Sequence, residues 1–166
     1  MMTIDNRNIG AANLPPDLRT VVDERTLLRL ILESIPEGDA ARPAAPATEV
    51  SLRPPMMLTL ICYSYAIGLY GSTDLESMLL QDRTLRYICA RQFPRWQDIR
   101  RFRRGNRARI EQTLSAVLMR VFLEHLFPSV PEMATLSMIK LCEQIQVEAN
   151  HRIETAILLD GVEVDV

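Results

Sequence analysis

An uncharged run from Met56 to Tyr70 limits most strongly what this chain can fold into. The run is apolar on nearly all sides of a helical projection, which is typical of a helix at the centre of a bundle. It is fifteen residues long, shorter than the roughly 20 residues that a helix needs to cross a bilayer. We therefore expect a buried central helix and no membrane partner.

Further helices are expected on both sides of this run, because glycine is scarce, with 6 in 166 residues, and apolar residues recur at helical spacing. The expected N-caps are Asp23, Ser51, Asp82 and Asn106, and Thr73 to Glu76 fits a capping box. The expected helices span residues 23–35, 51–70, 83–90, 96–104, 106–127 and 132–158, with a further one that starts at Ser72 or Thr73 and reaches about Gln81. The predicted fold class is all-α, a helical bundle.

Four segments follow from this pattern. Residues 1–36 form an N-terminal arm and a helix whose apolar stripe is Leu27, Leu28, Ile31 and Leu32. Residues 37–50 are rich in Ala, Pro, Glu and Thr, a composition typical of a linker. Residues 51–158 form the main helical domain, and residues 159–166 form a short acidic tail.

The cysteines and histidines indicate neither a metal site nor a catalytic one. Cys62, Cys89 and Cys142 are odd in number, far apart and set among apolar neighbours, so we expect buried free thiols in a reducing, cytoplasmic compartment. No pair has the spacing of zinc ligands, and His125 and His151 lie far from any such pair. The sequence contains no nucleophile elbow, phosphate-binding loop or H-E-x-x-H motif. We therefore expect a protein that is not an enzyme and that holds no metal or cofactor.

Positive charge is concentrated in one stretch, from Arg83 to Arg109. It contains ten arginines, no lysine and a single acid, Asp98, which gives a local charge of +9. Because the whole chain has a net charge of −2, the remainder carries −11. Such an asymmetry indicates a nucleic-acid contact within an otherwise solvated domain. A solvated helical face paired with acids elsewhere, or a contact with an acidic protein, would give the same pattern.

The helix expected at residues 96–104 has two faces. At 100° per residue, Ile99 and Phe102 lie on one side and would dock the helix on the core. The opposite, outward side carries Gln97, Arg100, Arg101 and Arg104. After two short helices, this element resembles the recognition helix of a helix-turn-helix unit, which enters the major groove of DNA.

Arginine suits this role because its planar fork binds phosphate, or the O6 and N7 atoms of guanine, through two hydrogen bonds. For Trp96 and Phe93, packing as a hydrophobic staple is the alternative to stacking on bases. We expect DNA contacts from Arg91, Arg95, Trp96, Gln97, Arg100, Arg101, Arg103, Arg104, Arg107 and Arg109.

A longer series of residues supports the same interpretation. The series comprises Leu52-Arg53-Pro54-Pro55-Met56-Met57-Leu58, Tyr63, Tyr65, Gly68, Ser72, Leu75-Glu76, Asp82, Pro94 and Ile99-Arg100-Arg101-Phe102-Arg103-Arg104. In order and spacing it resembles the N-terminal domain of bacterial DDE-type insertion-sequence transposases, the InsH type, over roughly residues 50–126. The resemblance implies a helical domain that binds the terminal inverted repeat of a mobile element and is associated with the bacterial nucleoid.

The chain departs from this family in three places. Arg95 and Asp98 stand where the family usually has an Asp before the basic helix and a Thr before the Ile. The family's catalytic domain, with three carboxylates that hold two metals, is not expected here, because the sequence ends at Val166. Leu159-Asp160-Gly161 resembles the segment around the first catalytic aspartate, but an acidic tail is the favoured interpretation.

The resulting prediction is a sequence-directed DNA-binding protein, non-catalytic alone, whose partner is double-stranded DNA. The alternative is a helical interaction module that forms a homodimer or binds a full-length transposase through residues 106–127 and 132–158. A decayed fragment without a role is a third interpretation.

Overall fold

The protein is an all-helical bundle, which confirms the predicted fold class. The computed structural model describes residues 14–37, 53–126 and 138–164, and within these ranges it contains seven α-helices and no strand. The helices are α1 (Glu24–Ser34), α3 (Pro54–Ala66), α4 (Ser72–Met78), α5 (Arg83–Cys89), α6 (Trp96–Gly105), α7 (Arg107–Val121) and α8 (Met138–Val164). A 3₁₀ turn, η2 (Leu18–Thr20), precedes α1, and a π-helical turn, η3 (Phe122–Leu126), extends α7. None of the helices in these ranges is long and apolar enough to cross a membrane.

Helix α3 lies at the centre of the bundle, as its sequence predicts. Every residue from Met57 to Ala66 is buried, and α3 packs against α1, α5, α6 and α7. The helix begins at Pro54 with Arg53 as N-cap, which makes no side-chain capping bond, so the expected start at Ser51 is wrong. It also ends before Tyr70, because Gly68 turns the chain with a φ of +83°.

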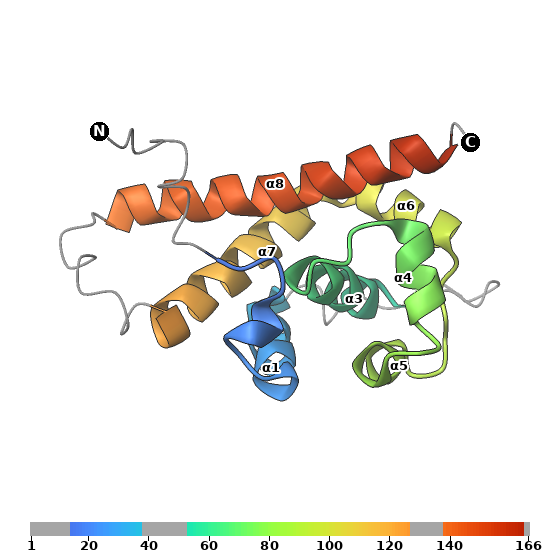
Figure 1. Cartoon of the computed structure of the whole chain (residues 1–166), viewed down its shortest axis with the longest axis horizontal. Coiled ribbons are helices and arrows are strands. Elements are labelled where there is room, and N and C mark those ends of the chain that lie inside the picture. The colour runs from blue at the N-terminus through green and yellow to red at the C-terminus, as the bar shows by residue number, and fades with distance from the viewer. Residues whose placement is uncertain (1–13, 38–52, 127–137, 165–166) are drawn as a thin grey trace, which may run out of the picture.

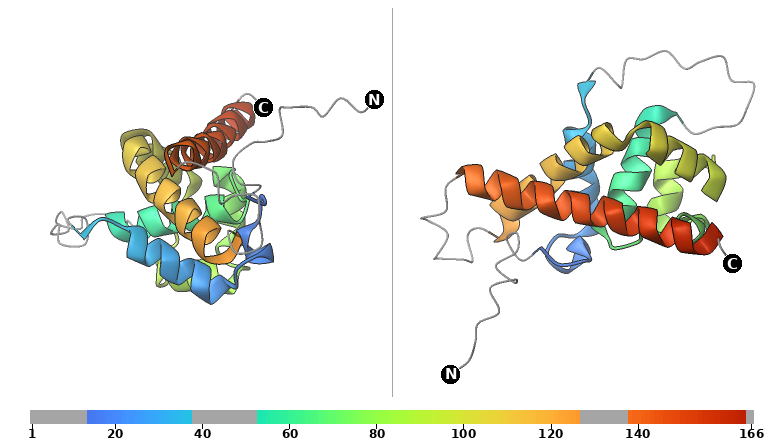
Figure 2. Two further views of the ribbon diagram at one scale, coloured as in Figure 1. Left: turned by 90° about the vertical axis from the view of Figure 1, so that its left-hand side faces the viewer. Right: turned by 90° about the horizontal axis from the view of Figure 1, so that it is seen from above.

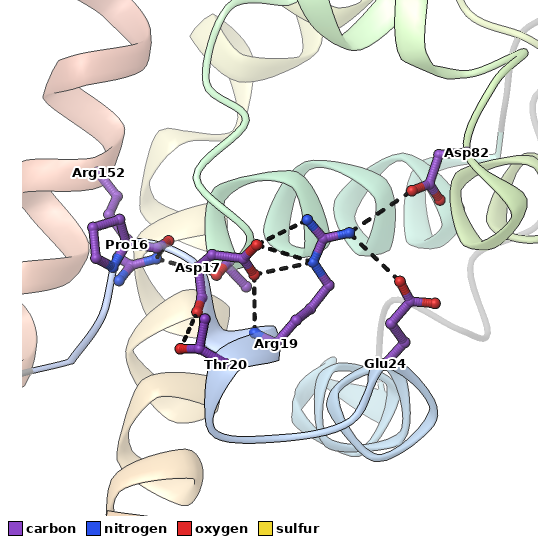
Figure 3. A network of polar contacts seen from close by, with 8 residues as sticks. Pro16, Asp17, Arg19, Thr20, Glu24, Asp82 and Arg152 are labelled. Carbon is purple, nitrogen blue, oxygen red and sulfur yellow. Dashed lines mark hydrogen bonds and ion pairs between the residues drawn. The ribbon is translucent and has the colours of Figure 1, made fainter.

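Arg152 of α8 joins the end of α3 to the N-terminal segment. Its side chain is fully buried and its guanidinium donates to the carbonyl oxygens of Tyr65 at 2.8 Å, Pro16 at 3.0 Å and Pro15 at 2.6 Å. The last carbonyls of a helix lack partners within the helix and carry its negative dipole, so a buried cation at this position satisfies both needs. Figure 3 shows Arg152 reaching toward Pro16.

Helix α1 belongs to the same core as the main bundle. It buries Leu27, Leu30 and Ile31 and packs against α3 and α7. The predicted stripe is therefore only partly right: Leu28 is partly buried and Leu32 is 54% exposed. The linker predicted at residues 37–50 lies almost entirely outside the described residues.

A polar network fixes the segment that leads into α1 (Figure 3). Asp17 caps η2 and accepts a 2.8 Å hydrogen bond from Arg19, which also lies 3.5 Å from Glu24 and 3.9 Å from Asp82. Asp82 accepts from the backbone of Leu85 at 2.9 Å, so its predicted role as the cap of α5 is confirmed. Hydrogen bonding from Arg19 holds the pKa of Asp17 below its usual value.

Asp23 caps α1 as predicted, with its carboxylate accepting from the backbone of Thr26 at 3.0 Å. Asn106 is the N-cap of α7 but makes no capping bond with its side chain, which instead donates to the carbonyl of Phe102 at 2.9 Å. Local sequence thus identified both N-cap positions, but it predicted the side-chain capping bond correctly only for Asp23.

The chain end and one cysteine differ from expectation. Helix α8 continues to Val164, so residues 159–164 are the last turns of a helix and not a separate acidic tail.

Cys62 and Cys89 are buried free thiols, and burial raises the pKa of Cys89 to about 11. Cys142 is exposed because it lies on the outer side of α8, contrary to the prediction of three buried thiols.

Replacing Arg152 with Ala is expected to lower the free energy of unfolding by about 3–5 kcal/mol, because the carbonyls at the end of α3 lose their buried cationic partner. Arg29 is the matched control, since it is exposed and its ion pair with Glu33 lies on the surface of α1. Arg29→Ala should cost about 0.5 kcal/mol or less. Urea unfolding followed by circular dichroism measures both, and equal midpoints for the two variants would contradict this role for Arg152.

Replacing Asp17 with Asn is expected to destabilise the protein at neutral pH but not in acid. Because the folded pKa of Asp17 is lowered, the ionised form contributes stability above the unfolded pKa of about 3.9, and that contribution is lost as the pH falls through the lower folded value. Thermal unfolding of both proteins between neutral pH and strong acid should therefore converge at the acid end. A gap in Tm that stays constant with pH would show that the charge of Asp17 is not involved.

Candidate nucleic-acid interface

Helix α6 carries most of the predicted DNA contacts and is set in place by α4. The two helices pack together, and with α5 they occupy the end of the molecule that the C-terminal part of α8 reaches (Figure 1). Glu76 of α4 accepts a 2.8 Å hydrogen bond from the backbone of Trp96, the first residue of α6. Asp98 accepts from the backbone of Arg95 at 3.2 Å. The start of α6 is thus capped by one distant and one local carboxylate.

The apolar anchors of α6 are as predicted. Ile99 is buried, and Phe102 is partly buried against the core. On a helical projection Arg103 lies on the same side of α6 as these two residues, and Arg100 lies at the edge of that side. Their positions on the helix therefore allow both arginines to face inward.

Arg100 and Arg103 are buried, each only 8% exposed, so the prediction that Arg100 points outward is wrong. Both guanidiniums approach the carboxylate of Asp160 on α8. Arg100 Nε lies 3.4 Å from Asp160 Oδ2, and Arg103 forms an ion pair with the same oxygen through Nη2. Arg103 Nη1 also donates to the hydroxyl of Tyr65 at 3.1 Å.

The other oxygen of Asp160 caps α4. The backbone N–H of Ser72 donates to Asp160 Oδ1 at 3.0 Å, and the Ser72 hydroxyl donates to the same oxygen at 2.8 Å. That hydroxyl also accepts from Arg100 Nε at 2.9 Å. The expected capping box from Thr73 to Glu76 does not form, because Gly71 is the N-cap and makes no side-chain bond. A carboxylate from the far end of the chain takes its place.

Burial raises the pKa of Tyr65 to about 12, against the opposing effect of the Arg103 charge. The Tyr65 hydroxyl therefore stays protonated and neutral at physiological pH. It can accept from Arg103 without adding a second negative charge beside Asp160. The cluster therefore contains two cations and one anion, linked to a neutral serine and a neutral tyrosine.

The outer side of α6 keeps the remaining predicted contacts. Arg95, Gln97, Arg101 and Arg104 are exposed. A shallow hollow of about 570 Å³ is lined by Trp96, Gln97, Arg100, Arg101 and Arg104. Trp96 is half-buried, and the Arg100 guanidinium lies 4.3 Å from the centre of its ring, a cation–π geometry. Trp96 therefore supports Arg100 and also borders the hollow.

The other predicted contacts lie at the edges of this surface. Arg91 is exposed in the turn after α5, where Ala90 and Arg91 have φ values of +46° and +68°. Arg107 forms a 2.5 Å ion pair with Glu154 of α8. Arg109 is half-buried and donates to Asn106 at 3.3 Å. The structure thus gathers Gln97, Arg101 and Arg104 on one face and places the others around or beneath it.

Ser72 and Asp160 were missed as members of this site. The sequence signal that could have identified Asp160 is its helical spacing from Ala149, Ile153 and Ala156, which lie on the buried side of α8. An acid on an apolar face requires a buried partner, and two of the many arginines of α6 provide it.

The chain matches no protein-family model, and no curated protein or solved structure is significantly similar to it. Within the described ranges, no group of three or more His, Cys, Asp or Glu residues is arranged to hold a metal ion.

Replacing Asp160 with Ala is expected to lower the free energy of unfolding by about 3–5 kcal/mol, because two buried guanidiniums and the start of α4 lose their partner. Glu154 is the matched control, an acid on the same helix whose ion pair with Arg107 is half-exposed. Glu154→Ala should cost about 1 kcal/mol or less. Chemical unfolding compares the two variants, and an Asp160→Ala protein as stable as Glu154→Ala would refute the buried cluster.

Proposed function

We propose that this protein binds double-stranded DNA through the outer face of α6, as a non-catalytic domain that resembles the N-terminal domain of an insertion-sequence transposase. The observation that carries the proposal is that Arg101 and Arg104 are exposed on the same face of α6 as Gln97. Among residues 14–37, 53–126 and 138–164, no carboxylate forms an ion pair with either arginine. Exposed guanidiniums without acidic partners are available to phosphates and base edges.

The dimensions of α6 agree with insertion into a groove. With its side chains an α-helix is about 10–12 Å across. The major groove of B-DNA is about 12 Å wide and admits one helix. Two short helices, α4 and α5, precede α6, and α4 packs against it, an order that favours a helix-turn-helix-like unit with α6 as the recognition helix.

The burial pattern narrows the proposed contact set. Arg100 and Arg103 are engaged by Asp160, so we assign them to the support of α6. The proposed reading residues are Gln97, Arg101 and Arg104. Arg95 and Arg91 lie toward the preceding turn, where they suit contacts with the phosphate backbone.

A second candidate function is association with another copy of the chain through α8. Several large apolar side chains on this helix are exposed, among them Ile139, Val147 and Leu158 at 73%, 66% and 69%. Exposed apolar rows of this kind are typical of helix–helix interfaces between subunits. The solution mass with and without DNA separates the two functions, because a dimer that ignores DNA would favour α8 pairing over DNA binding.

Replacing Arg101 and Arg104 together with Ala is expected to weaken binding to a mixed-sequence duplex and to lower the slope of log affinity against log salt by about 2, since each phosphate contact contributes about 0.9. The loss at low salt should be roughly tenfold or more, while helical content stays unchanged. Fluorescence anisotropy over a salt series measures both quantities.

The control is Arg25→Ala with Arg29→Ala, which removes the same charge from an exposed side of α1. This pair should bind DNA like the unmodified protein. Equal losses of DNA affinity in both double variants would show that net charge alone, and not the α6 face, determines binding. Binding that does not depend on salt would refute the proposed DNA contact.

A further inference from the structure

A cavity of about 580 Å³ lies between α6, α7 and α8, with Tyr65 of α3 in its wall. Its apolar walls come from three helices: Tyr65 of α3, Ile110 of α7, and Ile153 and Ile157 of α8. Pockets for small molecules typically measure about 300–1,000 Å³ and are lined mainly by apolar side chains. In size and lining, this cavity is therefore suited to a small organic ligand.

The polar part of the cavity is strongly cationic. Four arginines line it, Arg100, Arg103, Arg104 and Arg107, against one carboxylate, that of Asp160. The lining side chains thus carry a net charge of +3, of which the charge of Arg107 is paired with Glu154, a residue that does not line the cavity. Of these arginines, Arg104 is exposed and forms no ion pair with any acid in the described parts of the chain.

Arg103 lines the cavity but is already engaged inside the protein. It is 8% exposed, and its two terminal nitrogens are engaged by Tyr65, Tyr70 and Asp160. Its Nε, however, is buried and has no hydrogen-bond acceptor within the described residues. Buried donors in proteins nearly always have a partner, and leaving one unpaired costs about 1–3 kcal/mol.

We propose that this cavity binds an amphipathic organic anion. Its carboxylate or phosphate headgroup lies beside the guanidinium of Arg104, and its alkyl or aryl body lies against the isoleucines. A cationic ligand would be repelled by the net positive lining, and a neutral apolar ligand would leave Arg104 without an anionic partner. A bare phosphate would leave the apolar walls unused. The inference does not depend on DNA binding, although Arg104 belongs to both surfaces.

The direct test is isothermal titration calorimetry on the full chain without DNA, with every amphiphile kept below its micelle concentration. Decanoate and decyl phosphate are the two probes, and they distinguish the headgroups. Decyltrimethylammonium carries the same tail with the opposite charge, and acetate and inorganic phosphate are headgroups without a tail. The two anions should bind at least about tenfold more tightly than each of these controls, because both the charge-assisted bonds and the buried tail contribute. Octanoate should bind about fifteenfold more weakly than decanoate, because it lacks two methylenes and each buried methylene contributes roughly fourfold.

Two matched pairs of variants locate the site. Ile157→Trp should fill the cavity and weaken decanoate binding by about tenfold or more, since the ligand can no longer bury its tail. Leu158→Trp is its control, because Leu158 lies next to it on α8 but does not line the cavity. Arg104→Ala should weaken binding of both anions, whereas Arg101→Ala should not, because Arg101 lies outside the cavity. For DNA the expectation differs, because both arginine variants should weaken it.

The proposal is overturned if neither decyl anion binds, if decyltrimethylammonium binds as tightly as the anions, or if Ile157→Trp binds decanoate as well as Leu158→Trp does. A protein that binds decanoate but not DNA refutes only the proposed function. A protein that binds DNA but neither decyl anion refutes only this inference.

Discussion

The carboxylate of Asp160 joins three parts of the chain that are far apart in sequence. It caps the start of α4 through Ser72, and it holds Arg100 and Arg103 of α6. Burying charges costs solvation energy, which is recovered only where geometry and hydrogen bonding are good. The position of α6 on the bundle therefore depends on the last turns of α8. Arg152 plays a comparable role earlier on α8, where it binds the final carbonyls of α3 and the Pro15–Pro16 segment.

This interaction divides the arginines of α6 into two groups with different roles. Arg100 and Arg103 use their planar, multiply donating guanidiniums inside the protein, where they contact one carboxylate, a serine and a tyrosine. Arg101 and Arg104 face solvent and carry the proposed DNA contact. A count of positive charges along the sequence cannot separate these groups, because neighbours in sequence lie on opposite sides of a helix.

The features that local sequence decides were predictable. The buried α3 follows from a run without charges, and the caps at Asp23 and Asp82 follow from residue type and position. The cap of α4 was not predictable in this way, because its acceptor is 88 residues away. Asp160 was likewise predicted to lie in an acidic tail, because no second or third carboxylate in a comparable setting supports a metal site, and only its pairing with α6 explains its burial. The stripe of α1 was misplaced in part, because Leu30 and Leu32 are the same residue type and packing against α3 and α7 decides which is buried.

The most direct test of this account is an NMR titration that follows the arginine Nε–Hε signals as a mixed-sequence DNA duplex is added. The account predicts that the signals of Arg101 and Arg104 shift with DNA and return as salt is raised, because these guanidiniums exchange solvent for phosphate. The signals of Arg100 and Arg103 should stay in place, because Asp160 continues to hold them. Shifts at Arg100 and Arg103 that equal or exceed those at Arg101 and Arg104, or no shift at any of the four, would contradict it.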